Sequence, residues 1–147
     1  MTITGLDTFD KTVHQTNAWI NSVAGQLGTE ERELAFKALR ATLHALRDQL
    51  GADTAAHLGD QLPILLRGLY YEGWHPASTP SRIRHKAAFL ERIHSEFPAG
   101  QDLDPERIAS AVFSTMWAKI EPGEVAKLTR MLPEELRELW PRVARGE

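Results

Sequence analysis

Apolar residues recur at spacings of three and four along almost the whole chain, and no segment shows convincing two-residue alternation. This spacing is typical of amphipathic helices with one buried face. The first two apolar stripes consist of Phe9, Val13, Thr16, Ile20, Val23 and Leu27, and of Phe36, Leu39, Leu43, Leu46 and Leu50. Between them, Gly28 is a stop signal and Thr29 is a favoured N-cap. The pattern predicts two long helices joined by a short turn.

The remaining helices are predicted from start and stop residues as well as from periodicity. Asp104-Pro105-Glu106 is the strongest start, because it combines a cap, a proline at the first helical position and an acid in the first turn. Further helices are predicted over residues 53–61, 63–71, 86–97, 104–120, 122–131 and 133–143. The sequence therefore predicts an all-α fold of about eight helices.

The order of these signals repeats along the chain. A shift of 70 residues places Leu58, Leu62, Pro63, Leu66, Arg67 and Leu69 on the identical residues Leu128, Leu132, Pro133, Leu136, Arg137 and Leu139. Elsewhere mainly the apolar class persists, which is what a shared backbone requires. We predict two tandem four-helix repeats, about 7–74 and 81–144, with a linker over about 73–85. The repeats would pack into one bundle-like body with pseudo-two-fold character, in a single domain over 1–147.

Two segments carry a family resemblance. Gln61-Leu62-Pro63 and Tyr70-Tyr71-Glu72-Gly73-Trp74 are its more specific parts, within a match that extends from about Phe9 to Trp140. This pattern resembles the bacterial DUF2267 family, a domain of unknown function. The resemblance implies an all-helical fold with duplicated halves, and it implies no activity.

Composition narrows the possible functions. The chain has 147 residues, a net charge of −3 and no cysteine, which excludes disulfides and thiolate chemistry. A negative net charge disfavours nucleic acid as a partner. The densest apolar patch, Leu62 to Leu66, is far shorter than a membrane span, and the first residues do not resemble a signal peptide. We therefore expect a cytoplasmic protein that does not enter a membrane.

Candidate binding residues gather at the junction of the predicted halves, where the repeat is least regular. The aromatic residues there could line a ligand groove or a partner site, or they could seal the interface between the halves. The basic cluster in the linker could bind an anion or an acidic partner, or it could simply be solvated. The candidates are Arg67, Tyr71, Trp74, His75, Arg82 and Arg84. The matching positions of Arg67 and Arg137 also suggest a structural task, such as binding a carbonyl of a neighbouring helix.

Metal binding is a weaker alternative. Glu91 and His94 form a Glu-x-x-His motif, which supplies ligands in di-iron bundles, but on this helix Glu91 points away from the apolar face. A second such motif, Glu72 to His75, spans Gly73 and does not suit a continuous helix. No cofactor and no catalytic residue are predicted.

Two functions from different classes remain open at this point. The first is a non-enzymatic cytoplasmic interaction or regulatory module that binds an unknown protein partner. The second is a metal- or small-molecule-binding protein, possibly enzymatic, with a site near the junction of the two halves. A homodimer is a further possibility, since the sequence does not show whether every apolar stripe is covered within one chain.

Overall fold

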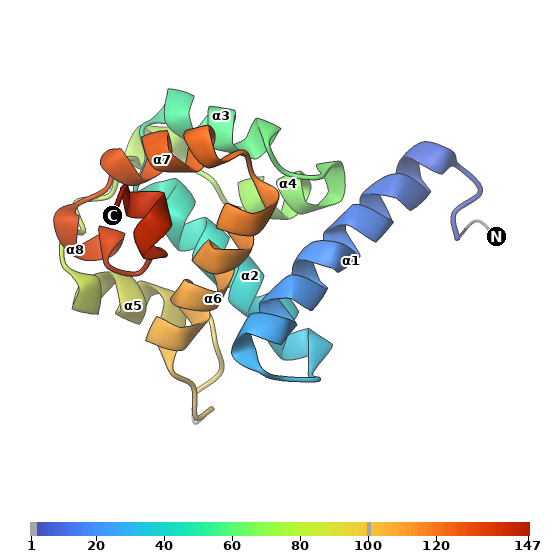
Figure 1. Ribbon diagram of the computed structural model, residues 1–147, viewed down its shortest axis with the longest axis horizontal. Coiled ribbons are helices and arrows are strands. Elements are labelled where there is room, and N and C mark those ends of the chain that lie inside the picture. Colours follow the sequence, from blue (N-terminus) through green and yellow to red (C-terminus); the bar gives the residue numbers. More distant parts are fainter. Residues whose placement is uncertain (1–2, 100) are drawn as a thin grey trace.

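The computed structural model describes residues 3–99 and 101–147, and these residues form eight α-helices and no strand (Figure 1). The all-α prediction is confirmed. The helices are α1 (Asp7–Leu27), α2 (Arg32–Asp48), α3 (Ala52–Asp60), α4 (Ile64–Tyr71), α5 (Lys86–His94), α6 (Pro105–Lys119), α7 (Pro122–Arg130) and α8 (Glu134–Arg137). Two short 3-10 helices, η1 (Pro76–Ser78) and η2 (Arg142–Arg145), lie in the linker and near the C-terminus.

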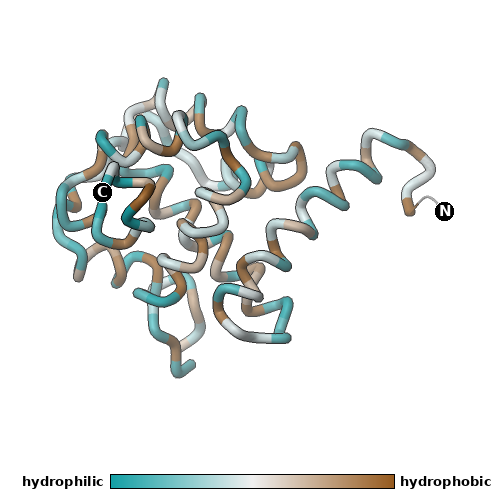
Figure 2. Tube along the Cα trace, viewed as in Figure 1, coloured by the Kyte–Doolittle hydropathy of each residue, from teal (hydrophilic) through white to brown (hydrophobic). Residues whose placement is uncertain are grey.

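The helices before the linker (α1–α4) and those after it (α5–α8) share one hydrophobic core. Helices α1, α2 and α6 pack against one another, and α5 packs on both α2 and α6. Buried side chains from all eight α-helices belong to a single cluster. Along α1 in Figure 2, short hydrophobic stretches recur between hydrophilic ones, as expected for a helix that buries one face. This packing places the linker between α4 and α5 on the surface of a shared body.

The first turns of α1 do not follow the predicted stripe. Thr16, Ile20 and Val23 are buried as expected, whereas Phe9 is 54% exposed. The N-terminal half of α1 projects beyond the other helices in Figure 1, so no neighbour covers the start of the stripe. Phe9 was therefore wrongly placed in the core, because periodicity shows which face of a helix is apolar but not how far its neighbours extend.

Local signals predicted some helix ends well. The Asp104 cap is confirmed, since its carboxylate accepts a hydrogen bond from the Glu106 amide at 3.1 Å. The prediction that Thr29 caps the second helix is wrong, because α2 begins at Arg32. The Thr29 hydroxyl instead accepts a hydrogen bond from the Glu31 amide within the turn.

The last predicted helix, 133–143, is also wrong in length. Helix α8 ends at Arg137, and the chain continues past Pro141 into η2. Proline has no amide hydrogen and disfavours helical geometry in the residue before it, which explains the break.

The agreement with a 70-residue shift is closest around α3 and α7, whose first and last residues lie 70 positions apart. After each of these two helices, one arginine binds backbone carbonyl groups at the helix C-terminus and just beyond it. The side chain of Arg67 donates to the Leu62 and Asp60 oxygens, and that of Arg137 donates to those of Leu132 and Arg130. Both arginines thus bind backbone carbonyls. A duplication of the whole chain stays a prediction.

Candidate functional site

A buried arginine organises the junction between α2, α4 and the linker. Arg47 is only 2% exposed, although arginine is normally a surface residue. One terminal nitrogen donates to the carbonyl oxygens of Tyr70 at 2.7 Å and Glu72 at 2.8 Å. Its Nε donates to the carboxylate of Asp48 at 2.8 Å. This side chain therefore fixes the point where α4 ends and the linker begins.

The far end of the linker is held by the next residues of α2 and its C-terminus. The amide of Ser81 donates to the carbonyl oxygen of Asp48 at 2.6 Å. The buried amide group of Gln49 donates to the carbonyl oxygen of Ile83 at 2.7 Å. The linker backbone is consequently anchored to the body at both of its ends, and it is not a loose connection.

A second set of polar contacts joins α2 to the C-terminal end of α5. His44 is buried, and its Nε2 lies 2.7 Å from the Leu69 carbonyl oxygen. A carbonyl can only accept, so Nε2 is the donor. The other ring nitrogen lies 3.3 Å from the Glu96 carboxylate. Arg92 donates to Glu96 at 2.8 Å and lies 3.5 Å from Asp48. The junction is therefore a connected network of hydrogen bonds and ion pairs.

This network predicts a loss of stability in acid. Desolvation raises the pKa of Glu96, but hydrogen bonds from His44 and Arg92 outweigh it, so the pKa falls below its ordinary value of 4.5. A carboxyl with a lower pKa in the folded state stabilises the fold above its unfolded pKa, and this stabilisation is lost as pH falls through the folded value. We expect urea unfolding midpoints to fall below about pH 4.5. Glu96→Gln should flatten this part of the profile, and an unchanged profile would contradict the assignment.

Three of the predicted binding residues make hydrogen bonds or packing contacts within the protein itself. Arg67 binds carbonyl groups, as described above. The Tyr71 hydroxyl donates to the Ala56 carbonyl oxygen at 3.3 Å, and a Cβ at Gly59 would overlap that hydroxyl. The Trp74 ring packs 5.3 Å from the Tyr71 ring, centroid to centroid. The aromatic residues therefore form packing between α3, α4 and the start of the linker.

The other three predicted residues, one histidine and two arginines, are exposed on the anchored linker. His75 and Arg82 line one hollow of about 360 Å³ together with Asp48, Gln49 and Arg92. Arg84 is exposed two residues further along. Within residues 3–99 and 101–147, the side chains of His75, Arg82 and Arg84 form no ion pair or hydrogen bond. The structure thus brings His75 and Arg82 to the same hollow.

The proposed metal ligands are not brought together with others. Glu91 is exposed and His94 is half-buried. Glu72 pairs with Arg40 rather than with His75. The described part of the chain holds no group of three His, Asp or Glu side chains placed to bind a metal ion.

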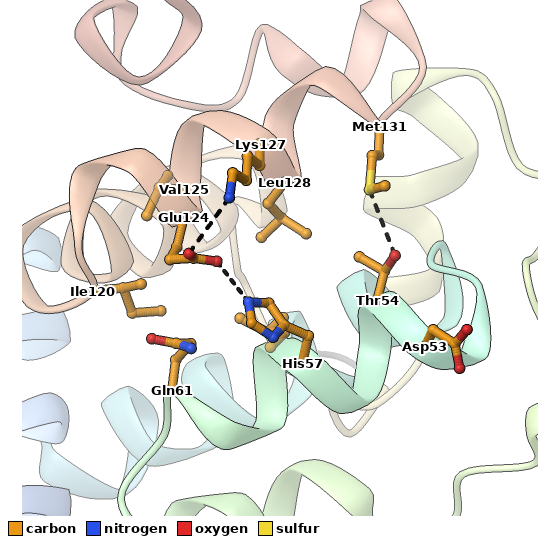
Figure 3. A pocket seen from close by; sticks show the side chains of 11 residues that line it. Asp53, Thr54, His57, Gln61, Ile120, Glu124, Val125, Lys127, Leu128 and Met131 are labelled. Carbon is orange, nitrogen blue, oxygen red and sulfur yellow. Dashed lines mark hydrogen bonds and ion pairs between the residues drawn. The ribbon is translucent and has the colours of Figure 1, made fainter.

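The sequence did not identify a second hollow, which lies between α3 and α7 (Figure 3). It has a volume of about 210 Å³ and mainly apolar walls. At its mouth, Nε2 of His57 lies 2.6 Å from the Glu124 carboxylate. Hydrogen bonding from His57 lowers the pKa of Glu124. The two residues stand 67 positions apart in the chain, so no local motif could have linked them.

These features define an all-α protein with a polar junction and an apolar cleft between helices from its two parts. The chain belongs to the DUF2267 family, described as an uncharacterized conserved protein, whose sequence model matches residues 16–139. A comparison with functionally curated proteins gives no match. Among the helices in the described part of the chain, none has the length and apolar character needed to cross a membrane.

Proposed function

We propose that the protein is a non-enzymatic cytoplasmic interaction or regulatory module that binds an acidic segment of a partner protein. The binding surface consists of His75, Arg82 and Arg84 and is called the linker surface below. The observation that supports this proposal is the combination of a fixed backbone with unpaired cations. Hydrogen bonds from α2 hold the linker in place, while the positively charged side chains of Arg82 and Arg84 are exposed.

The charge distribution around the linker supports an acidic partner. The nearby carboxylates of Asp48, Glu72 and Glu96 already pair with arginines or with His44. The positive charge of Arg82 and Arg84 is therefore not neutralised by these acids. Exposed cations on a pre-organised backbone favour an oppositely charged partner, because less conformational entropy is lost on binding. The net charge of −3 would at the same time discourage binding to nucleic acid.

Charge reversal on the linker surface is expected to weaken this binding strongly. A fluorescein-labelled peptide of alternating glutamate and serine serves as the probe in a fluorescence polarisation titration at low salt. Arg82→Glu with Arg84→Glu should weaken binding about tenfold or more, because two favourable charge contacts become repulsive. Lys11→Glu with Lys119→Glu makes the same change in net charge at exposed positions in α1 and α6 and is the control.

The two double variants separate a specific surface from general electrostatics. Equal weakening by both would show that only net charge matters, and the proposal would then be wrong. No binding by the wild-type protein would also count against it.

Cell fractionation tests the cytoplasmic location, light scattering on a sizing column tests the homodimer, and elemental analysis tests the metal alternative. Each of these stays a prediction.

A further inference from the structure

The cleft between α3 and α7 has the character of a binding site for a small molecule. Its floor and walls are formed by Leu58 from α3, by Val125 and Leu128 from α7, and by Ile120 just before α7. All four are nearly buried by the surrounding structure, so the apolar surface is fixed by the core beneath it. The volume of about 210 Å³ remains unfilled by protein side chains.

The two helices present corresponding positions to the cleft. Figure 3 shows Gln61 opposite Ile120 and Thr54 opposite Met131, so α3 and α7 run in opposite directions. Eight of the lining residues form four pairs that lie 70 positions apart: Thr54 and Glu124, His57 and Lys127, Leu58 and Leu128, Gln61 and Met131. Only the leucine pair is apolar in both helices. The long or polar residues on either side of it lie at the rim.

Two contacts cross the mouth of the cleft and limit what can enter. Nε2 of His57 lies 2.6 Å from the Glu124 carboxylate, and the Thr54 hydroxyl lies 3.6 Å from the Met131 sulfur (Figure 3). A partner helix would need a continuous open groove about 10 Å wide, which these bridges interrupt. A small molecule can instead enter beside the bridges. The occupant favoured by this geometry is therefore a small molecule rather than a protein segment.

The charges at the rim favour a neutral molecule. Glu124 has two partners, His57 and, at 3.8 Å, Lys127. Its charge is thus compensated by protein groups at the mouth, while the walls below are apolar. Asp53, the other carboxylate of the lining, points away from the cleft (Figure 3). A charged ligand inside the cleft would have to give up its hydration without an unpaired opposite charge to receive it, which is costly. Thr54 and Gln61 can still hydrogen-bond one polar substituent.

We propose that this cleft binds a neutral, mainly apolar molecule with the size of one substituted ring. An apolar protein cavity of about 150 Å³ is known to accommodate benzene, so the larger cleft here has room for a ring and a short substituent. The site is formed by α3 and α7 and shares no residue with the linker surface. The two proposals therefore stand independently.

The test is a titration with p-cresol, followed by the methyl resonances of the full-length protein. We expect saturable shifts of the Leu58, Val125 and Leu128 methyl groups with a Kd below about 1 mM. Thr54→Trp and Gln61→Trp fill the cleft from opposite ends, and each should weaken binding about tenfold or more. Ala52→Trp adds the same side chain at an exposed position of α3 outside the cleft and should bind normally.

Several results would overturn the proposal. These are an absence of saturable shifts up to the solubility limit, shifts centred elsewhere in the protein, or undiminished binding by a folded filling variant. Far-UV circular dichroism confirms that each variant is folded. The two tryptophans fill the cleft from different ends, so one folded variant is sufficient to test whether the cleft is the binding site.

Discussion

Replacing Arg47 with methionine should lower the free energy of unfolding by about 3–5 kcal/mol. Methionine fills much of the same space but cannot donate hydrogen bonds. The carbonyl oxygens of Tyr70 and Glu72 would lose this donor, and Asp48 would keep only its 3.5 Å contact with Arg92. The Arg47 side chain that holds them is itself almost fully buried. Removing one partner from a buried polar network leaves the others desolvated and unpaired, which costs more than the hydrogen bonds contribute.

Urea denaturation followed by circular dichroism measures this effect. Arg40→Met is the matched control, because Arg40 lies on the same helix but makes a solvent-exposed ion pair with Glu72. The control should cost less than about 1 kcal/mol. Equal losses for the two variants would show that the Arg47 contacts contribute no more than a surface ion pair, and the account of the anchored linker would fail.

The role of Arg47 could not be predicted from the sequence, and the reason is physical. A cap such as Asp104 depends on a residue two positions away, so local sequence is sufficient to predict it. The environment of Arg47 depends on carbonyls 23 and 25 positions further along, which reach it only after α4 has packed on α2. Composition and periodicity carry no information about that approach, and a mid-chain arginine is ordinarily expected at the surface.

The cleft shows the same division between local and tertiary information. Leu58 and Leu128 carry the repeat pattern, and both are buried as an apolar stripe predicts. The space between them depends on the distance between two helices that are far apart in the chain, and no helical period encodes that distance. Periodicity therefore predicts which residues of a helix are buried, but it does not predict where two packed helices leave a cleft between them.

The predicted repeat also helps to explain where the polar network lies. A shift of 70 residues takes His44 to Ser114 and Arg47 to Trp117, so these network residues of α2 have no charged counterparts in α6. Helix α2 contacts the linker between α4 and α5 through Arg47 and through Asp48 and Gln49 at its end. The network therefore lies where α2 anchors the linker.

Trp140→Ala is expected to cost about 3–5 kcal/mol of unfolding free energy. The Trp140 ring is 2% exposed and stacks on Phe113 of α6, with centroids 4.1 Å apart and planes within 5°. Truncation would leave a cavity between the C-terminal segment and α6. Helix α8 has only four residues and cannot persist without packing, so residues 134–145 should lose their protection together.

Amide hydrogen exchange of residues 134–145 and urea unfolding together test this prediction. Trp140→Phe keeps a ring on Phe113 and removes an indole N–H that has no partner in the described structure, so it should cost less than about 1.5 kcal/mol. Trp117→Ala is the second control, since Trp117 is only partly buried. If Trp140→Ala left exchange in 134–145 unchanged, this aromatic stack would not be what holds the C-terminal segment to α6.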